Sequence, residues 1–338
     1  MPIDLRSDTV TRPTPDMLQY MFSTKVGDDV FNEDPTINEL EAKAATMFGK
    51  EAGLFCPSGT MTNQAAIKAH TQPGDEVICD ATAHIYNYEG GGMSFNSGVQ
   101  AKLIEGDRGR FTAKQLEEVL HGGADWLAKT SLVSIENTCN RGGGGYYTIK
   151  NVKEISAVCR ANKLALHMDG ARIFNALVET GDDPKEYGKV CDSISVCFSK
   201  GLGAPVGSVV LGSKDFIHKV RRIRKVFGGG MRQAGYLAAA AIYALDHNVK
   251  RLKDDHKRAK HIGGLLQGKR YIEKMLPVET NIIIFNLKDE MPADKFVSTL
   301  KQNDILVSLM GKQAVRMVTH LDFTDAMLDT VEKVIKKI

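Results

Sequence analysis

The sequence has little of what marks several protein classes. Only one of its 338 residues is tryptophan, and aromatic residues make up 7%. The 44 basic and 41 acidic side chains nearly cancel, leaving a formal net charge of +3. A protein built mainly to bind nucleic acid carries a strong basic excess, so we expect no nucleic-acid partner. No run of about 18 apolar residues occurs, so we expect no membrane span.

The cysteines form no disulfide or metal-binding pattern. None is spaced as C-x-x-C, and no combination with histidine has zinc-finger spacing, so we expect reduced thiols and no metal site. The start of the chain, MPIDLRSDTVTRP, is polar and lacks the apolar core of a secretory signal. These features favour a cytoplasmic location. The six cysteines are Cys56, Cys79, Cys139, Cys159, Cys191 and Cys197.

The chain length suggests roughly two domains. Residues 1–38 show little periodicity and contain several prolines, which predicts an irregular N-terminal arm. Residues 39–248 are expected to form a large domain. The pattern then changes, and residues 249–338 are expected to form a small α+β domain with strands near 281–287 and 315–319.

Between residues 53 and 211, short apolar runs alternate with stretches of helical periodicity. This alternation predicts an α/β fold with a mostly parallel seven-stranded sheet flanked by helices. Ligands bind at the carboxyl ends of the strands in such sheets, so polar residues that follow the runs are candidates for a site. The runs are 53–56, 76–79, 101–104, 131–135, 164–168, 193–198 and 206–211.

Lys200 follows the sixth run and precedes a glycine-rich, uncharged segment. Its nearest charged neighbours in sequence are Asp192 and Lys214, and both flanks look buried. Burial disfavours an ammonium ion and makes the amine a better nucleophile toward a carbonyl, as a Schiff-base lysine requires. From this stretch alone, a lysine on a surface turn between two strands is an equal alternative.

The segment from Pro57 to Thr60 leads from the first run into a helix. Free N–H groups at a helix start, the small Gly59 and the hydroxyls of Ser58 and Thr60 would suit a phosphate. The alternative is a plain helix cap, where serine and threonine are common.

Two titratable residues follow the second run, near the same sheet edge. His84 could stack on a flat ring or exchange protons. Glu89, beside three glycines, is a candidate acid or water-holding residue. The alternative for His84 is a partly buried structural histidine.

Asp169 stands at the end of the fifth run, and Arg172 comes three residues later. A carboxylate there can pair with a cationic ring nitrogen, and an arginine can hold a carboxylate through two parallel hydrogen bonds. The alternative is an ion pair that closes the turn. Arg316, in an apolar run of the C-terminal part, also needs an anionic partner, and a substrate carboxylate would serve.

Basic residues gather between positions 219 and 232. Lys225 and Arg232 flank a triple glycine at 228–230, so this loop could offer cations to a phosphate, and a solvated surface turn is the alternative. The cluster KVRRIRK at 219–225 could also indicate nucleic-acid binding, but it lacks interleaved aromatic residues and belongs to a nearly neutral chain.

Taken together, these residues form a pattern that none of them shows alone. Lys200 lies 31 residues after Asp169, about one crossover unit later. A phosphate-binding turn, a ring-stacking histidine, an acid for a ring nitrogen, an arginine for a carboxylate and an isolated lysine are what a pyridoxal-phosphate site requires. We therefore predict pyridoxal 5′-phosphate as the cofactor.

Six segments resemble those of the low-specificity threonine aldolases, which belong to the β-eliminating lyases among the fold type I pyridoxal-phosphate enzymes. The resemblance covers nearly the whole chain. It implies cleavage of L-threonine, L-allo-threonine and similar β-hydroxy-α-amino acids to glycine and an aldehyde. The segments are RSDTVTRPT (6–14), GDDVFNEDPT (27–36), PSGTMTNQ (57–64), HMDGARIFNA (167–176), SKGLGAPVGS (199–208) and GGGMRQAG (228–235).

The resemblance also implies a role for each candidate residue. Lys200 would anchor the cofactor, Asp169 would pair with its ring nitrogen, and His84 would stack on the ring. The implied assembly is a homotetramer, a dimer of dimers with shared active sites. The other implied roles are phosphate binding for Ser58, Gly59 and Thr60, substrate-carboxylate binding for Ser7, Arg172 and Arg316, and binding from a neighbouring subunit for Lys225 and Arg232.

One position departs from the family. A histidine near the substrate's β-hydroxyl is common in its E-N-T-H-N segment, but this chain has Cys139 there. Cysteine is smaller and a weak hydrogen-bond partner, which leaves the handling of the hydroxyl and the preference between threonine and allo-threonine open. We expect His84 to be the base, directly or through a water. Because of Cys139, β-elimination or racemisation of small amino acids is the alternative reaction.

Overall fold

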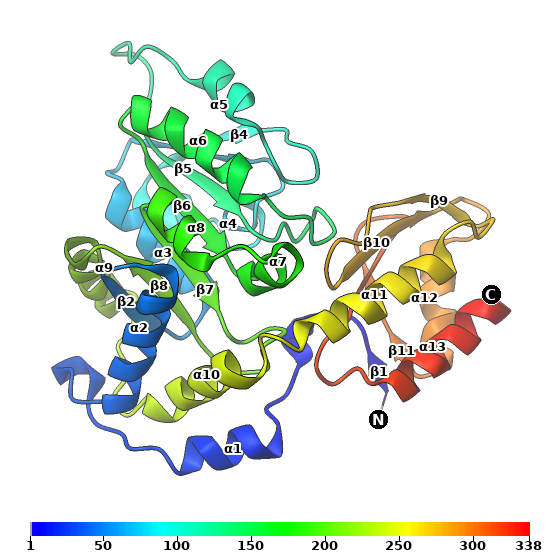
Figure 1. Cartoon of the computed structure of the whole chain (residues 1–338). Coiled ribbons are helices and arrows are strands. Elements are labelled where there is room, and N and C mark those ends of the chain that lie inside the picture. The colour runs from blue at the N-terminus through cyan, green and yellow to red at the C-terminus, as the bar shows by residue number, and fades with distance from the viewer. Residues whose placement is uncertain (1) are drawn as a thin grey trace.

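Seven strands form the central sheet of the larger part of the molecule (Figure 1). The computed structural model describes residues 2–338. Strand β8 is antiparallel to both of its neighbours, and the other neighbouring pairs are parallel, which confirms the predicted mostly parallel sheet. The order is β2 (Ala52–Cys56), β8 (Ser208–Gly212), β7 (Ser193–Cys197), β6 (Ala165–Gly170), β5 (Thr130–Glu136), β3 (Glu76–Asp80) and β4 (Gln100–Ile104).

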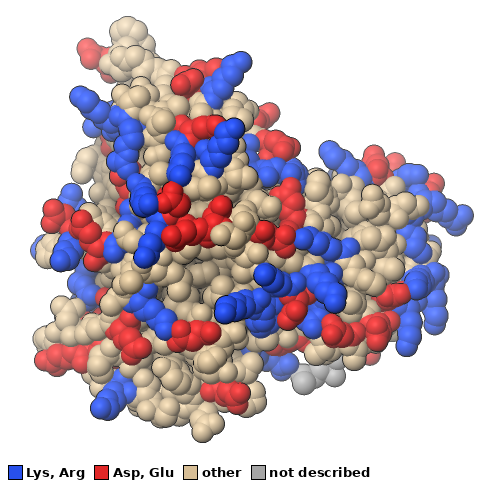
Figure 2. All heavy atoms as spheres, viewed as in Figure 1, with Lys and Arg blue, Asp and Glu red and all other residues tan. Residues whose placement is uncertain are grey.

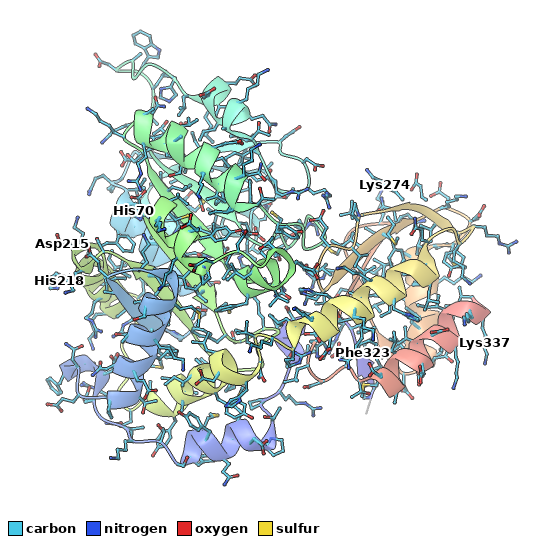
Figure 3. The ribbon with its side chains drawn as sticks, viewed as in Figure 1. His70, Asp215, His218, Lys274, Phe323 and Lys337 are labelled. Atoms are coloured by element: carbon cyan, nitrogen blue, oxygen red, sulfur yellow. The ribbon has the colours of Figure 1, made fainter. Side chains whose placement is uncertain are left out.

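Helices cover both faces of this sheet, which is why every residue of β3, β7 and β8 is buried. On one face, α3 (Gly59–His70) packs against α9 (Lys214–Val226). There the His70 ring stacks on Phe216 at 4.5 Å, near Asp215 and His218 (Figure 3). The opposite face carries α2 (Pro35–Phe48), α6 (Ile149–Ala161) and α8 (Pro184–Val190).

Side-chain caps fix where helices begin near the sheet. The carboxylate of Asp34 accepts hydrogen bonds from the backbone N–H groups of Thr36 and Ile37, both at 3.1 Å, and so starts α2. Its second oxygen accepts from the N–H of Gly235, which begins α10 (Gly235–His247). One buried carboxylate therefore joins the starts of two helices that are far apart in sequence.

A second, four-stranded antiparallel sheet forms the smaller part of the molecule (Figure 1). The strands expected near 281–287 and 315–319 are β10 (Ile282–Leu287) and β13 (Ala314–Val318), between the edge strands β12 (Ser308–Leu309) and β9 (Ile272–Met275). The apolar face of this sheet packs on helices. These are α11 (Leu252–Leu266), α12 (Ala293–Gln302) and α13 (Asp325–Lys337).

The N-terminal arm connects the two parts. Strand β1 (Ile3–Asp4) pairs in parallel with β11 (Ile305–Leu306) of the smaller part, and Leu5 is fully buried there. The chain then passes the sheet edge and forms α1 (Pro15–Phe22), which lies along α10 of the larger part. This path carries Ser7 and Asp8 to the boundary between the two parts.

Two expectations about whole-chain properties can be compared with the structure. All six cysteines are free and buried. Within residues 2–338, no helix is both long and apolar enough to cross a membrane.

Candidate active site

A cavity of about 360 Å³ lies where the carboxyl ends of β3, β5, β6 and β7 face the smaller part of the molecule. Five residues that the sequence pointed to line it together, although they come from the arm, three different strand ends and the smaller part. The lining consists of these five, Ser7, His84, Arg172, Lys200 and Arg316, together with Thr9, Tyr88, Asn140, Arg141, Ser308, Leu309 and Met310.

Lys200 sits in a tightly held loop between β7 and β8. Its carbonyl accepts a hydrogen bond from the N–H of Gly203 at 2.8 Å, and the side chain of Asn248 donates to the carbonyl of Leu202 at 2.8 Å. Gly207 has a φ of 118°, and a Cβ there would lie 2.5 Å from the Phe55 ring. The glycine therefore allows a close chain reversal, and the fixed backbone directs Lys200 to the cavity.

Asp169 lies behind the cavity, at the end of β6, with only 3% of its surface exposed. One carboxylate oxygen accepts from the N–H of Ala171 at 3.1 Å, and the other accepts from the side-chain amide of Asn63 at 2.9 Å. Both donors are neutral, so they do not compensate the negative charge of Asp169. A cationic ring nitrogen would complete this environment.

His84 begins the short helix α4 (His84–Asn87) and is oriented by a buried carboxylate. Its Nδ1 lies 3.0 Å from Glu89, whose carboxylate also accepts from the amides of Asn63 and Gln64. Burial would lower the pKa of His84, but the hydrogen bond that the ring donates to Glu89 and the charge of Asp169 outweigh it and raise the pKa. The bond to Nδ1 leaves Nε2 available to the cavity.

Arg172 is held by Asp8 in a buried, two-pronged ion pair. Its Nη2 and Nε lie 2.6 and 2.8 Å from the two carboxylate oxygens. Burial of Asp8 would raise the pKa of its carboxyl, but the charge of Arg172 outweighs it and holds the pKa far below the usual range. From its sequence context, Arg172 is expected to bind a substrate carboxylate through two hydrogen bonds, but it forms these two bonds with Asp8. Only Nη1 of Arg172 is left to face the cavity, 3.4 Å from the amide oxygen of Asn140.

Arg316 approaches the same amide oxygen from the smaller part. Its Nη1 lies 3.1 Å from Oδ1 of Asn140, and its Nη2 donates to the carbonyl of Arg6 at 3.0 Å. Burial and the nearby charge of Arg172 lower the pKa of Arg316. Since Arg141 also lines the cavity, this end has a surplus of positive charge and suits an anion such as a carboxylate.

The candidate phosphate-binding turn lies beside the lysine loop. Cys56 and Cys197 both pair with Ser208 in the sheet, so the turn that follows β2 and the loop that follows β7 leave the same edge. Ser58 caps α3, a helix of 12 residues, by accepting from the N–H of Met61. The first N–H groups of a helix lack partners within it, so they can bind an anion.

Ser208 gives an independent sign that this turn suits a polar group. Its hydroxyl is buried and has no hydrogen-bond partner among residues 2–338. It lies 3.6 Å from where a Cβ on Gly59 would stand, so the glycine leaves open space beside it. The turn and Asp169 could therefore hold the two ends of a cofactor that combines a phosphate with a nitrogen ring.

The residues named from the sequence also include Cys139, Lys225 and Arg232, and none of these three lines the cavity of a single chain. Cys139 is 2% exposed, and its thiol lies within hydrogen-bonding distance of the carbonyls of Gly109 and Glu136. It packs beneath the site, whereas the resemblance placed position 139 near the substrate's β-hydroxyl. Lys225 and Arg232 are exposed outside the lining, and Arg232 pairs with Asp28 at 2.9 Å.

The basic cluster at 219–225 belongs to α9. Arg224 is 2% exposed and pairs with Asp29 at 2.6 Å, and Arg221 pairs with Asp29 and Glu41. Carboxylates within the fold therefore neutralise part of the positive charge of the cluster. On the face that Figure 2 shows, basic and acidic side chains are interspersed.

Several lining residues were missed from the sequence. Asn140 and Arg141 follow β5 at the carboxyl edge of the sheet, so the rule that identified the other polar residues could have found them. No local pattern marks Ser308, which reaches the site because it pairs with Arg316 across β12 and β13. Asn63 lies in the first turns of α3 and had no signal of its own.

Comparison with known proteins assigns the chain to a family. Residues 4–290 match the family of beta-eliminating lyases. Low-specificity L-threonine aldolase 1 of Arabidopsis thaliana is 41% identical over 329 residues, covering 95% of this chain and 92% of that protein. The low specificity L-threonine aldolase of Escherichia coli K12 is 41% identical over 330 residues, covering 97% of each.

The fold agrees with this assignment. A solved structure of a Leishmania major threonine aldolase superposes with a TM-score of 0.87 at 20% sequence identity and covers 99% of both chains. At that identity the likeness concerns the fold alone. Because the family match extends over most of the sequence, the chain belongs to the beta-eliminating lyase family.

Proposed function

We propose that this protein is a pyridoxal-phosphate-dependent aldolase that cleaves L-threonine and L-allo-threonine to glycine and acetaldehyde. One observation carries the proposal: Lys200, His84 and Arg316 face a single cavity, with the carboxylate of Asp169 behind it. The names of the similar plant and bacterial proteins point to the same reaction.

The residues present fit the cofactor. Lys200 would hold it covalently, Asp169 would meet its ring nitrogen, and His84 would lie against its ring. The turn at 58–60 would receive the phosphate through backbone N–H groups and through the hydroxyls of Ser58 and Thr60. When bound, the cofactor supplies an electron sink for the electron pair left on Cα after the Cα–Cβ bond breaks.

The protein's own groups position the substrate and move its proton. Arg316 and the free Nη1 of Arg172 bind the substrate carboxylate, with the Ser7 hydroxyl beside them. This grip sets the orientation of the Cα–Cβ bond. His84 Nε2 accepts the proton of the β-hydroxyl, directly or through a water, as that oxygen becomes the aldehyde carbonyl. The same proton is then available to Cα, which completes glycine.

The reaction is tested by supplying the purified protein with pyridoxal phosphate and then with each threonine isomer. We expect glycine and acetaldehyde in equal amounts. A keto acid, or an inverted amino acid without glycine, would instead establish β-elimination or racemisation. The reason for considering those alternatives was Cys139, and its thiol is packed against Gly109 and Glu136 outside the cavity lining.

Replacing Glu89 by glutamine should slow the reaction without releasing the cofactor. An amide at this position lacks the charge that raises the pKa of His84, and it offers one acceptor oxygen where three donors now meet. We expect kcat to fall about tenfold, since one lost charged hydrogen bond is worth about 1.5–3 kcal/mol. The acid limb of the pH–rate profile should move to lower pH.

The measurement is kcat for L-threonine as a function of pH, with cofactor content followed by absorption. Glu105→Gln, at an exposed position outside the cavity lining, is the matched control and should behave like wild type. An unchanged pH profile in Glu89→Gln would show that Glu89 does not orient His84.

We also propose that the protein works in the cytoplasm as a homotetramer with shared sites. Exposed apolar side chains support an assembly: Phe22 is 77% exposed, Phe31 67% and Val226 83%. Lys225 and Arg232 lie outside the cavity of their own chain, as residues that serve a neighbouring subunit would. Sedimentation of the purified protein as a monomer would refute this assembly.

A further inference from the structure

Glu136, the last residue of β5, lies directly under the candidate site. It is 8% exposed and pairs in register with Asp169 of the neighbouring strand. Its two carboxylate oxygens contact two different loops. Oε2 accepts from the backbone N–H of His84 at 2.8 Å, and Oε1 accepts from the backbone N–H of Asn140 at 2.7 Å.

Each of these contacts controls one wall of the cavity. The N–H of His84 is the first of helix α4, so an acceptor there fixes where the helix begins and where the His84 ring stands. On the other wall, the amide oxygen of Asn140 accepts from Arg172 and from Arg316. The position of Asn140 therefore helps to set the position of the Arg316 guanidinium, while Arg172 is held mainly by Asp8.

The electrostatic setting of Glu136 disfavours the charged form of its carboxyl. Burial and the charge of Asp169 raise the pKa of Glu136 to about 7. An ionised carboxylate at this position is therefore disfavoured by its surroundings, apart from the two backbone N–H groups and His84. A neutral apolar residue would pack at lower cost but would leave both N–H groups without partners.

We propose that Glu136 is a positioning residue that fixes the ring-stacking wall and the carboxylate-binding wall of the site relative to each other. It touches neither the cofactor nor the substrate and acts through His84 and Asn140. Its catalytic consequence rests on the proposed function, whereas its effect on the two loops does not.

Glu136→Gln tests the proposal because an amide has one acceptor oxygen and one NH₂ group. One of the two backbone N–H groups must then lose its acceptor and face another donor. We expect backbone hydrogen exchange in the cofactor-loaded protein to speed up about tenfold or more in at least one of two peptides, 81–90 or 137–146, namely the one whose N–H loses its acceptor. For L-threonine, kcat/KM should fall by about tenfold to a hundredfold while the cofactor remains bound.

Glu41→Gln is the matched control. Glu41 is equally buried, at 8% exposure, and burial raises the pKa of its carboxyl to about 7 as well. It serves a single backbone N–H, that of Phe55 at 2.8 Å, which the oxygen of glutamine can still accept. We expect this variant to leave exchange in both peptides and kcat/KM unchanged, even if its melting temperature shifts.

The outcomes separate the possibilities. Unchanged exchange in both peptides of Glu136→Gln, or an effect of equal size in Glu41→Gln, would overturn the proposal. If Glu136→Gln does not fold, Glu136→Asp replaces it, because the shorter side chain keeps the charge but cannot reach both loops. A wild-type protein that forms no glycine from threonine would refute the proposed function, while the exchange result would still decide the role of Glu136.

Discussion

Replacing Lys200 by alanine should abolish glycine formation from L-threonine, with kcat lower on the order of 10⁴-fold or more, the scale observed when a covalent nucleophile is removed. Lys200 is the one lysine among the described residues that line the cavity. Hydrogen bonds within the loop fix its backbone. Because no other described lysine lines the cavity, no neighbouring amine can replace it.

The decisive measurement is the absorption spectrum of the protein loaded with pyridoxal phosphate. The wild type should show an absorption band at a much longer wavelength than the protein band. Lys200→Ala should lack this band, which belongs to the covalently held cofactor. Lys214→Ala is the control, because Lys214 is the next lysine in sequence but is exposed at the start of α9. A Lys200→Ala variant that keeps both the band and the activity would contradict the assignment of the site.

The second large effect concerns stability and arises from Asp8. Asp8→Asn removes the charge that pairs with Arg172, and both side chains are almost completely buried, at 0% and 6% exposure. An uncompensated guanidinium in this setting costs about 3–5 kcal/mol. We expect the free energy of unfolding to fall by this amount, and the arm to loosen from the start of α7 (Ile173–Thr180).

Urea denaturation measures this loss, with Asp4→Asn as the matched control from the same arm. Asp4 also pairs with an arginine, at 2.6 Å, but its partner Arg6 is 52% exposed. A surface pair of this kind is worth about 0–1 kcal/mol, so the control should lose little. Equal decreases in the free energy of unfolding of the two variants would show that the buried pair of Asp8 and Arg172 stabilises the fold no more than a surface pair does.

The same pair predicts an acid dependence with a definite sign. Because Arg172 holds the folded-state pKa of Asp8 below its ordinary value of 3.8, the folded state releases this proton more readily than the unfolded chain. The stabilisation is therefore fully present above about pH 4 and is lost as the pH falls further. Below that pH, the difference in stability between wild type and Asp8→Asn should shrink.

Asp8 also bears on substrate binding. It neutralises the charge of Arg172, whereas Arg316 donates only to the neutral oxygens of Asn140 and Arg6, so the charge of Arg316 is the more available of the two to a substrate carboxylate. Sequence reasoning treated the two arginines alike, because nothing local to Arg172 identifies a partner 164 residues away.

The positions of the main candidate residues followed from the sequence for a simple reason. Residues that directly follow an apolar run lie at the carboxyl edge of a parallel sheet, so Lys200, Asp169 and His84 had to share one edge once the runs were strands. The same argument placed the small residues at 57–60 where a phosphate could bind. Strands buried on both faces read as continuous apolar runs, which is why the seven-stranded sheet could be predicted.

Other elements were hidden because local patterns do not encode them. The edge strand β9 is short and half exposed, and it depends on pairing with β10 rather than on apolar content. In α9 the basic cluster could indicate nucleic-acid binding from its sequence, but Asp29 of the arm neutralises Arg224 within the fold. The strand depends on a neighbouring strand, and the charge of Arg224 depends on a partner 195 residues away.

The sequence by itself therefore determined the sheet, its edge and the chemical types of the groups along that edge, because these follow from periodicity and strand direction. Only the tertiary structure decided which groups are partners. It placed Asp8 on Arg172, Glu89 behind His84 and Glu136 beneath both walls, and it turned Cys139 away from the cavity. Such pairings depend on side-chain packing between distant segments, which no local pattern contains.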